Sequence, residues 1–278
     1  MKKENTLYVS DLDGTLLNKS AKLSSYTINT INALIDKGLN FSVATARSLL
    51  PVKSMLKGMK INIPIILLNG VLIYDTNKEE YIKINKIQSE SVTEIIQAIK
   101  TYDVSGFMYE LEDSGAFNTY HELSQNVPVA DYILERAAKY NSVQPTNGLS
   151  DVSLNNIVYF TLIDTYDRLL PLYNFFSQRS NIKQEFYKNV YNPNFWFLEL
   201  FSEQSSKKLA VEFLKEKYHF EHIVGFGDNN NDFPLFEVCD VRIAVRNATP
   251  KLKEAATHIC ASNDDDGVAR WLEENFDV

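Results

Sequence analysis

The sequence predicts an α/β fold in which a doubly wound, mainly parallel sheet is interrupted by an α+β insert. At both ends of the chain, short apolar runs alternate with stretches of helical spacing, which is typical of parallel strands joined by helices. Between these ends, aromatic and β-branched runs stand among helical stretches instead. We therefore expect a core domain built from residues 1–81 and 203–278, and a second domain formed by residues 82–202.

The first half of the core begins with the apolar run Leu7–Val9, which we expect to be a strand. The stretch Tyr26–Lys37 carries apolar residues at helical spacing and ends at Gly38, a residue that commonly follows a helix. The same alternation then predicts a strand at Leu39–Thr45, a helix near Ser48–Lys57 and a strand at Ile65–Leu68.

The insert and the second half of the core are predicted in the same way. In the insert, strands are expected at Gly106–Leu111, Asn156–Ile163 and Phe195–Phe201, and helices near Glu90–Thr101, Val129–Tyr140 and Tyr166–Ser180. From Gln204 onward the alternation of strands and helices resumes. It predicts a helix to Tyr218, a strand at Ile223–Phe226, a helix near Asp232–Val238, a strand at Val241–Ala244 and a last helix near Asp266–Phe276.

Composition and charge limit the class of protein. The 278 residues are 45% hydrophobic, which is enough for one large core or two ordinary ones. A net charge of −8 disfavours nucleic-acid binding, which needs clustered Lys and Arg. No run approaches the ~20 apolar residues of a membrane span or has the form of a signal peptide. The two cysteines, Cys239 and Cys260, are typical of reduced thiols in a cytoplasmic protein, and no obligate protein partner is indicated.

Two carboxylates follow the first predicted strand directly, in the run Asp11–Thr15. Open parallel sheets bind ligands at the carboxyl ends of their strands. Carboxylates two residues apart on a turn can divide the work: one attacks as a nucleophile, and the other gives a proton to the leaving oxygen and later takes one from water. A solvated turn is the simplest alternative. A calcium loop is disfavoured, because Val9 would stand at its first position without a side-chain oxygen.

A second acidic run, Gly225–Asp232, follows the predicted strand Ile223–Phe226, so its acids can meet Asp11 at the same edge of the sheet. Oxygen ligands from Asp11, Asp228 and a backbone carbonyl, completed by water and a substrate phosphate, suit Mg²⁺. A calcium loop is again disfavoured, because Phe233 stands where that loop needs glycine.

With these runs, the chain resembles the haloacid dehalogenase (HAD) superfamily of phosphotransferases, in the Cof-type branch with a large α/β cap of the C2B type. The resemblance covers nearly the whole chain. Its motifs occur in the family's order: D-x-D-G-T at Asp11–Thr15, a threonine at Thr45, a lysine at Lys207 and G-D-x-x-N-D at Gly227–Asp232. The resemblance implies a Rossmann-like core and makes residues 82–202 a cap that selects the substrate.

The resemblance implies that Asp11 is the nucleophile and Asp13 the general acid and base. Mg²⁺ is expected as the cofactor, and the acids expected at its site are Asp11, Asp13, Asp228 and Asp232. Asp232 would either bind the metal or hold its waters. An aspartate that attacks an anionic phosphoryl group meets charge repulsion, which the metal would offset.

The resemblance also implies which residues bind the phosphoryl group. Thr45 and Lys207 are expected to hold it, and Asn231 to orient either Lys207 or the phosphoryl group. Lys208 stands where this branch commonly has glycine, so either lysine could be the functional one. Arg47 could contact the substrate phosphate or form a surface ion pair.

Three further segments match family turns. Asn69 and Gly70 are expected either to touch the substrate or to serve as a turn. Asn247 is expected to make a loop contact. The acidic run Asp264–Asp266 is expected to cap the last helix and to be solvated.

The predicted function is hydrolysis of small phosphorylated metabolites, with sugar phosphates favoured, through an aspartyl phosphate on Asp11. Two alternatives stay open. One is phosphate transfer to a second hydroxyl, as in phosphosugar mutases. The other is a non-catalytic sensor of phosphorylated metabolites, although such a sensor would not require both a nucleophile and an acid/base. The sequence leaves open the substrate, the cap residues that select it and the oligomeric state.

Overall fold

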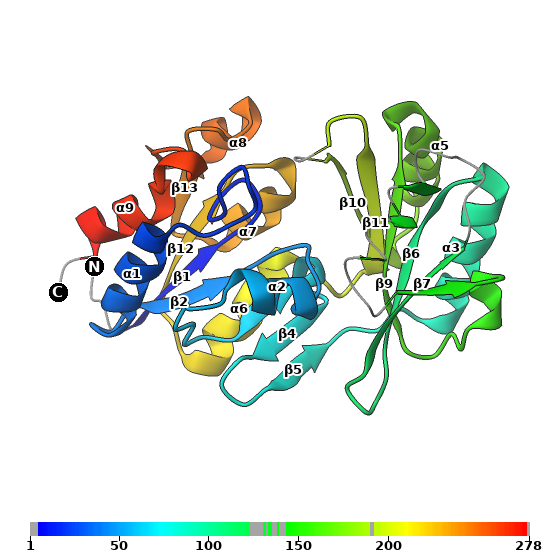
Figure 1. Ribbon diagram of the computed structural model, residues 1–278, viewed down its shortest axis with the longest axis horizontal. Helices are drawn as coiled ribbons and strands as arrows, with labels where there is room; N and C mark the ends of the chain where they lie inside the picture. The colour runs from blue at the N-terminus through cyan, green and yellow to red at the C-terminus, as the bar shows by residue number, and fades with distance from the viewer. Residues whose placement is uncertain are drawn as a thin grey trace. The chain divides into compact units, whose positions relative to one another are not determined.

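The chain forms two compact units in a computed structural model (Figure 1) that describes residues 5–122, 130–131, 133–134, 138, 143–189 and 192–276. The first unit comprises Met1–Lys83 and Ser206–Val278, and the second comprises Ile84–Ser205. The predicted helix near Val129–Tyr140 falls largely outside the described residues. That the second unit acts as a substrate-selecting cap stays a prediction.

A five-stranded parallel sheet lies at the centre of the first unit, in the order β14-β13-β12-β1-β2. Its strands are β1 (Thr6–Ser10), β2 (Asn40–Val43), β12 (His222–Gly227), β13 (Val241–Val245) and β14 (His258–Cys260). β1 lies between β12 and β2, with Ser10 opposite both Phe226 and Val43. The loops that follow these three strands therefore begin side by side at one edge of the sheet.

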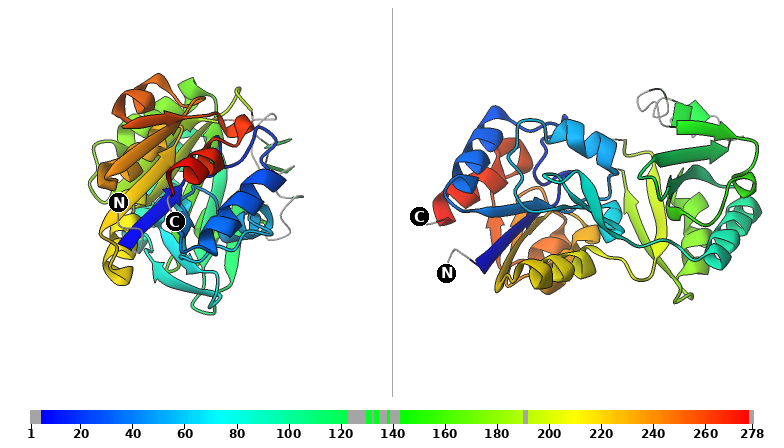
Figure 2. Two further views of the ribbon diagram at one scale, coloured as in Figure 1. Left: turned by 90° about the vertical axis from the view of Figure 1, so that its left-hand side faces the viewer. Right: turned by 90° about the horizontal axis from the view of Figure 1, so that it is seen from below.

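Helices cover both faces of this sheet (Figure 2). α1 (Ser25–Ile35) packs against α9 (Gly267–Asn275) on one face, and α6 (Lys207–Tyr218) packs against α7 (Phe233–Val238) on the other. Alternate residues of β1 point to opposite faces of the sheet. Leu7 and Val9 share a core cluster with Leu214 of α6, whereas the ring of Tyr8 packs edge to face against that of Phe276, with 6.0 Å between the ring centroids. This unit also contains the α-helices α2 (Leu49–Met55) and α8 (Pro250–Ala255).

The strand predicted at Ile65–Leu68 does not extend the parallel sheet. β3 (Ile65–Leu67) instead begins a separate antiparallel sheet with β4 (Leu72–Asp75) and β5 (Glu80–Ile84), and a single bridge between Ala44 and Ile66 links it to the end of β2. The chain reverses in the short helix η2 (Leu68–Gly70), which returns it antiparallel to β3.

The second unit is a six-stranded sheet in the order β10-β11-β9-β6-β7-β8, with α3 and α5 packed on it. Apolar residues of α3 and α5, such as Ile95 and Leu172, share a buried cluster with Phe160 and Leu198 of the sheet. A parallel sheet covered by helices and a separate α+β unit confirm the predicted fold class. Among the described residues of this unit, the structure contains α3 (Ser89–Tyr102), β6 (Ser105–Leu111), β7 (Phe117–Glu122), β8 (Val143–Thr146), the short helix η3 (Leu149–Asp151), β9 (Ile157–Asp164), α5 (Tyr166–Phe176), β10 (Ile182–Lys188) and β11 (Trp196–Ser202).

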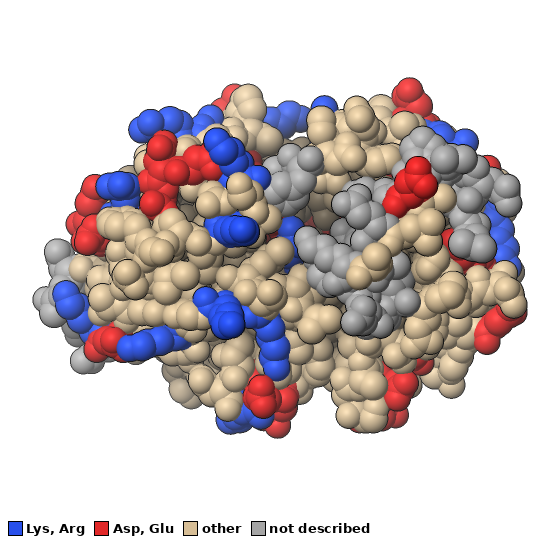
Figure 3. Space-filling view, in the orientation of Figure 1, with Lys and Arg blue, Asp and Glu red and all other residues tan. Residues whose placement is uncertain are grey.

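The surface carries both signs of charge. On the face shown in Figure 3, Lys and Arg side chains are interspersed with Asp and Glu, so the net negative charge of the chain is not gathered into one patch there. None of the helices that the structure describes is long and apolar enough to cross a membrane.

Candidate active site

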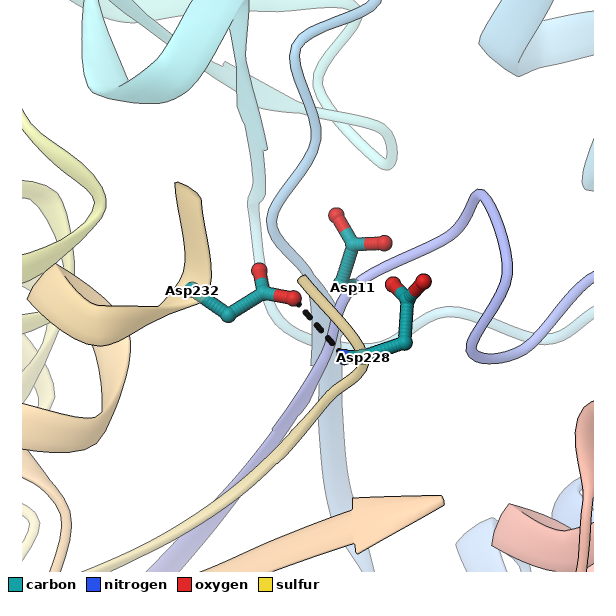
Figure 4. A group of neighbouring side chains, drawn as sticks. All are labelled: Asp11, Asp228 and Asp232. Carbon is teal, nitrogen blue, oxygen red and sulfur yellow. Dashed lines mark hydrogen bonds between the residues drawn. The ribbon is translucent and has the colours of Figure 1, made fainter. Parts of the chain in front are cut away.

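Three aspartates meet at the carboxyl edge of the parallel sheet (Figure 4). Asp11 follows β1 and Asp228 follows β12, and the Asp11 amide donates to the carbonyl of Phe226 at 3.0 Å. Asp232 lies in the short helix η4 (Asn230–Asp232). One carboxylate oxygen from each aspartate lies within 4.8 Å of the others, and all three side chains are buried. The two acidic runs of the sequence therefore form one site.

A tight turn carries the first motif. The carbonyl of Leu12 accepts hydrogen bonds from the amides of Thr15, Leu16 and Leu17. Gly14 has a φ of +82°, and a Cβ atom there would lie 2.4 Å from Asp228 Oδ2. Only glycine fits this close approach without strain. The Thr15 hydroxyl also donates to Asp228 Oδ1 at 3.0 Å, a contact that the sequence analysis did not anticipate although Thr15 belongs to the motif.

Asp232 organises the loop after β12. Its Oδ2 accepts from the amides of Asp228 at 2.9 Å and Asn229 at 3.1 Å, the first of which is the dashed line in Figure 4. Its Oδ1 accepts from Lys207 at 2.7 Å. Both oxygens of this fully buried carboxylate are thus engaged by the protein. Asn231, the residue before it, is half-buried in η4, and its orienting role stays a prediction.

Lys207 is the cation of the cluster. It is the first residue of α6, its side chain is 1% exposed, and its Nζ donates to Asp11 Oδ1 at 2.6 Å. Lys208 is 39% exposed and pairs with Glu237 at 3.2 Å. Of the two candidate lysines, the structure therefore brings Lys207 to the acids and leaves Lys208 at the surface.

The electrostatics of the cluster favour a bound cation. Burial raises the pKa of Asp11 to about 7, although Lys207 acts in the opposite direction. Burial, followed by the charges of Asp232 and Asp11, raises the pKa of Asp228 well above its ordinary value. Burial alone would lower the pKa of Lys207, but the charges of Asp11 and Asp232 outweigh it and raise that pKa. When all three acids are ionised, they carry an excess of negative charge over the one lysine, and a divalent cation would neutralise it.

Thr45 and Arg47 approach from the neighbouring strand. Thr45 lies just beyond β2, is buried, and accepts a hydrogen bond at its Oγ1 from the Arg47 amide at 3.2 Å. Arg47 donates to both oxygens of Asp13, from Nε and from a terminal nitrogen, each at 2.6 Å. Asp13 lies outside the group of three acids that could hold a metal. Of the two roles considered for Arg47, the structure shows an ion pair, and its partner is Asp13.

Asn69 and Gly70 lie in η2, both with positive φ, at 53° and 96°. The Asn69 amide donates to the Thr45 carbonyl at 2.9 Å, which ties this turn to the second motif. A Cβ atom at Gly70 would lie 2.2 Å from the carbonyl oxygen of Ser206, the residue before Lys207. Gly70 thus lets the turn pack against the start of α6, and its contact with substrate stays a prediction.

The sequence model of the haloacid dehalogenase-like hydrolases matches residues 8–272. The chain belongs to this family. The predicted resemblance is therefore confirmed at the level of the haloacid dehalogenase-like hydrolases, and the acids described above lie within the matched residues.

Relatives cover nearly the full length of this haloacid dehalogenase-like hydrolase. The chain is 25% identical to the 5-amino-6-(5-phospho-D-ribitylamino)uracil phosphatase YitU of Bacillus subtilis, over 98% of each chain. It is 28% identical to YwtE of the same organism, which bears the same enzyme name, over 95% of this chain and 96% of YwtE. The crystal structure of TM0651 from Thermotoga maritima has 29% identity and a TM-score of 0.76, and 96% of each chain is covered. Together, the family and these relatives support the conclusion that the protein is a phosphatase.

Proposed function

We propose that the protein is a Mg²⁺-dependent phosphatase that hydrolyses small phosphorylated metabolites, sugar phosphates among them, through an aspartyl phosphate on Asp11. The observation that carries the proposal is the buried contact of Asp11 with Lys207, at 2.6 Å, within the group formed by Asp11, Asp228 and Asp232. Two cysteines that form no disulfide, Cys239 and Cys260, suit a cytoplasmic location for this activity.

The three buried carboxylates fit a divalent cation. Their oxygens lie within 4.8 Å of one another, and hard oxygen ligands are those that Mg²⁺ prefers. Asp11 and Asp228 would hold the ion, and Asp232 would either join them or keep the loop in place through its bonds to Lys207 and to backbone amides. A bound Mg²⁺ would supply positive charge that offsets the repulsion between Asp11 and an anionic phosphoryl group.

In the first step, a carboxylate oxygen of Asp11 attacks phosphorus and the bond from phosphorus to the ester oxygen breaks. The leaving alcohol takes a proton from Asp13. Lys207 keeps the attacking carboxylate in one orientation. Because a phosphate competes strongly for a guanidinium, an arriving substrate would draw Arg47 from Asp13. An Asp13 oxygen could then take up from solvent the proton that it gives to the leaving alcohol.

In the second step, water attacks the phosphorus of the aspartyl phosphate and gives one proton to Asp13. The bond from phosphorus to the Asp11 oxygen breaks, which releases inorganic phosphate and restores the Asp11 carboxylate. The net reaction converts a phosphate ester and water into an alcohol and phosphate, and Asp13 returns to its starting state. Thr45 and Asn231 are proposed to hold the phosphoryl oxygens during both steps.

Release of inorganic phosphate from a panel of compounds tests this function. The panel contains hexose phosphates, nucleoside monophosphates, an aryl phosphate and 5-amino-6-(5-phospho-D-ribitylamino)uracil, the compound in the names of YitU and YwtE. We expect turnover with Mg²⁺ and none with a chelator. Binding of these compounds without turnover would favour the sensor alternative, and transfer of the phosphate to a second sugar hydroxyl would favour the mutase alternative.

The affinity for Mg²⁺ is expected to fall as the pH drops below about 7. In the metal-free protein the pKa of Asp11 is about 7, so a cation that binds below this pH must displace a proton. The same raised pKa values mean that the metal-free folded protein keeps protons which the unfolded chain loses near pH ~4, so its stability falls as the pH rises from ~4 to ~7. Calorimetric titration at several pH values measures the affinity, and thermal unfolding with and without Mg²⁺ measures the stability. An affinity that stays constant from about pH 8 to about pH 6 would contradict the role of Asp11 as a ligand.

A further inference from the structure

Two asparagine side chains from the C-terminal part of the chain hold the turn of the first motif. Asn247 Nδ2 donates to the carbonyl of Gly14 at 2.7 Å, and Asn263 Nδ2 donates to the carbonyl of Leu17 at 2.8 Å. The two asparagines are also linked, because the Asn263 amide donates to Asn247 Oδ1 at 3.0 Å. In Figure 1 the dark-blue loop after β1 lies beside the segment that follows β13.

The segment that carries Asn247 also holds the loop of the fourth motif. The amide of Thr249 donates to the backbone carbonyl of Asp228 at 2.8 Å. On the other side, the space where Gly14 lacks a side chain is filled by the Asp228 carboxylate, which a Cβ atom would approach to 2.4 Å. One short segment therefore contacts both the turn that carries Asp13 and the loop that carries Asp228.

The turn of the first motif is compact enough to move as a unit. The Leu12 carbonyl gathers the amides of Thr15, Leu16 and Leu17, and Asp13 lies inside this turn. Because Gly14 directly follows Asp13, a displacement of the Gly14 peptide reaches the Asp13 side chain and the Asp228 carboxylate together. A misplacement of about 1 Å at a reacting group can lower a rate about 100-fold.

We propose that Asn247 is a positioning residue for phosphoryl transfer: by holding the Gly14 carbonyl, it keeps the acid/base Asp13 and the acid Asp228 in one fixed arrangement. This inference rests on the proposed phosphatase function. Asn247 itself is exposed, so an alanine at this position removes the two hydrogen bonds without opening a cavity in the core.

The chain offers a matched control at Asn32. Its Nδ2 donates to the carbonyl of Gly58 at 2.8 Å, and its Oδ1 accepts from the amide of Lys60 at 2.8 Å. Asn32→Ala therefore removes the same pair of bonds as Asn247→Ala, but in a part of the first unit to which the proposed mechanism assigns no role. A general loss of stability would affect both variants, whereas a loss of positioning would affect Asn247→Ala alone.

The decisive readout is the dependence on the leaving group. An alkyl phosphate needs a proton from Asp13 as its alcohol leaves, whereas 4-nitrophenyl phosphate has a stable leaving anion and needs little help. In single turnovers with excess enzyme and Mg²⁺, we expect Asn247→Ala to slow alcohol release from an alkyl phosphate about 10–100-fold, and release from 4-nitrophenyl phosphate by a few-fold at most. Asn32→Ala should leave both rates near those of the wild type. Equal losses on the two substrates, or no loss, would overturn the proposal.

Hydrogen exchange provides a readout that does not depend on activity. In metal-free protein, Asn247→Ala should speed exchange of the amides of Thr15, Leu16 and Leu17, and Asn32→Ala should not. If Asn247→Ala does not fold, Asn263→Ala can take its place in this experiment. It removes the bond to the Leu17 carbonyl and should speed the exchange of the same amides. Unchanged exchange of these amides would show that the asparagine side chains do not hold the turn of the first motif, and would overturn the proposal. If the wild type releases no phosphate from any substrate, the proposed function and the positioning role fail together. The exchange data still show in that case whether the two asparagines hold the turn.

Discussion

Replacing Lys207 by alanine is expected to lower turnover by at least about 100–1000-fold, because it removes the only cation within hydrogen-bond reach of Asp11 among the described residues. It also leaves Asp11 and Asp232 buried without their counter-ion, which is expected to lower the free energy of unfolding by about 3–5 kcal/mol in metal-free protein. Phosphate release and chemical denaturation measure the two effects. Added Mg²⁺ should recover part of the stability but not the activity.

Lys208→Ala provides the matched control, because it removes the neighbouring lysine of the same helix. Lys208 is 39% exposed and pairs only with Glu237 among the contacts described, so its loss should cost no more than about 1 kcal/mol and leave turnover within about twofold. If Lys208→Ala lost most of its turnover while Lys207→Ala stayed active, Lys208 would be the functional lysine and our assignment of Lys207 would be wrong.

Asp11→Asn is expected to reduce turnover at least about 10,000-fold, since an amide does not attack phosphorus as a carboxylate does. The substitution keeps the size of the side chain and an oxygen that can accept from Lys207. It also removes one of three buried acids. At pH 8 and without metal, the unfolding temperature of Asp11→Asn should therefore be at least as high as that of Lys207→Ala. Steady-state phosphate release and thermal unfolding check both expectations.

Asp36→Asn controls for the general effect of removing an aspartate from the first unit. Asp36 lies at the end of α1 and forms an exposed pair with Lys60, so its replacement should leave turnover unchanged. If Asp11→Asn retained turnover close to that of Asp36→Asn, Asp11 would not be the nucleophile.

Much of the site could be predicted from the sequence because parallel strands bring their carboxyl ends to one edge. Asp11 and Asp228 each follow a short apolar strand, so their meeting follows from the alternation of strands and helices alone. The choice between Lys207 and Lys208 could not be made in this way, since one residue along a helix turns the side chain by about 100° and both positions carry the same residue type. The contacts of Lys207 Nζ with Asp11 and Asp232, and the exposed pair of Lys208 with Glu237, show which lysine points inward.

Contacts between side chains far apart in the sequence were harder to predict. The pairing of Arg47 with Asp13 depends on how the loops after β1 and β2 approach each other, which residue type and spacing do not reveal. The acidic run Asp264–Asp266 was expected to cap the last helix and to be solvated. Asp266 is the N-cap residue of α9, but its side chain makes no capping bond, and its Oδ1 accepts instead from the hydroxyls of Ser24 and Thr27.

Elements at sheet edges were also missed. β5, β10 and β14 are short or mix polar with apolar residues, because one side of each lies toward solvent, and their sequences lack the apolar runs that marked β1 and β12. The strand β3 was predicted at nearly the right residues but in the wrong sheet, because hydrophobicity shows that a strand is buried and not which neighbour it pairs with.

The central claim is that Asp11 carries the phosphoryl group, and the most direct measurement is to look for it there. Wild-type protein and Asp11→Asn are quenched with acid during turnover of a good substrate with Mg²⁺, and their peptides are mapped by mass spectrometry. We predict a phosphorylated peptide that contains Asp11 in the wild type, absent from Asp11→Asn and from wild type treated with a chelator. Steady turnover with no phosphate on Asp11 under any quench time, or phosphate trapped on another residue, would contradict the proposed mechanism.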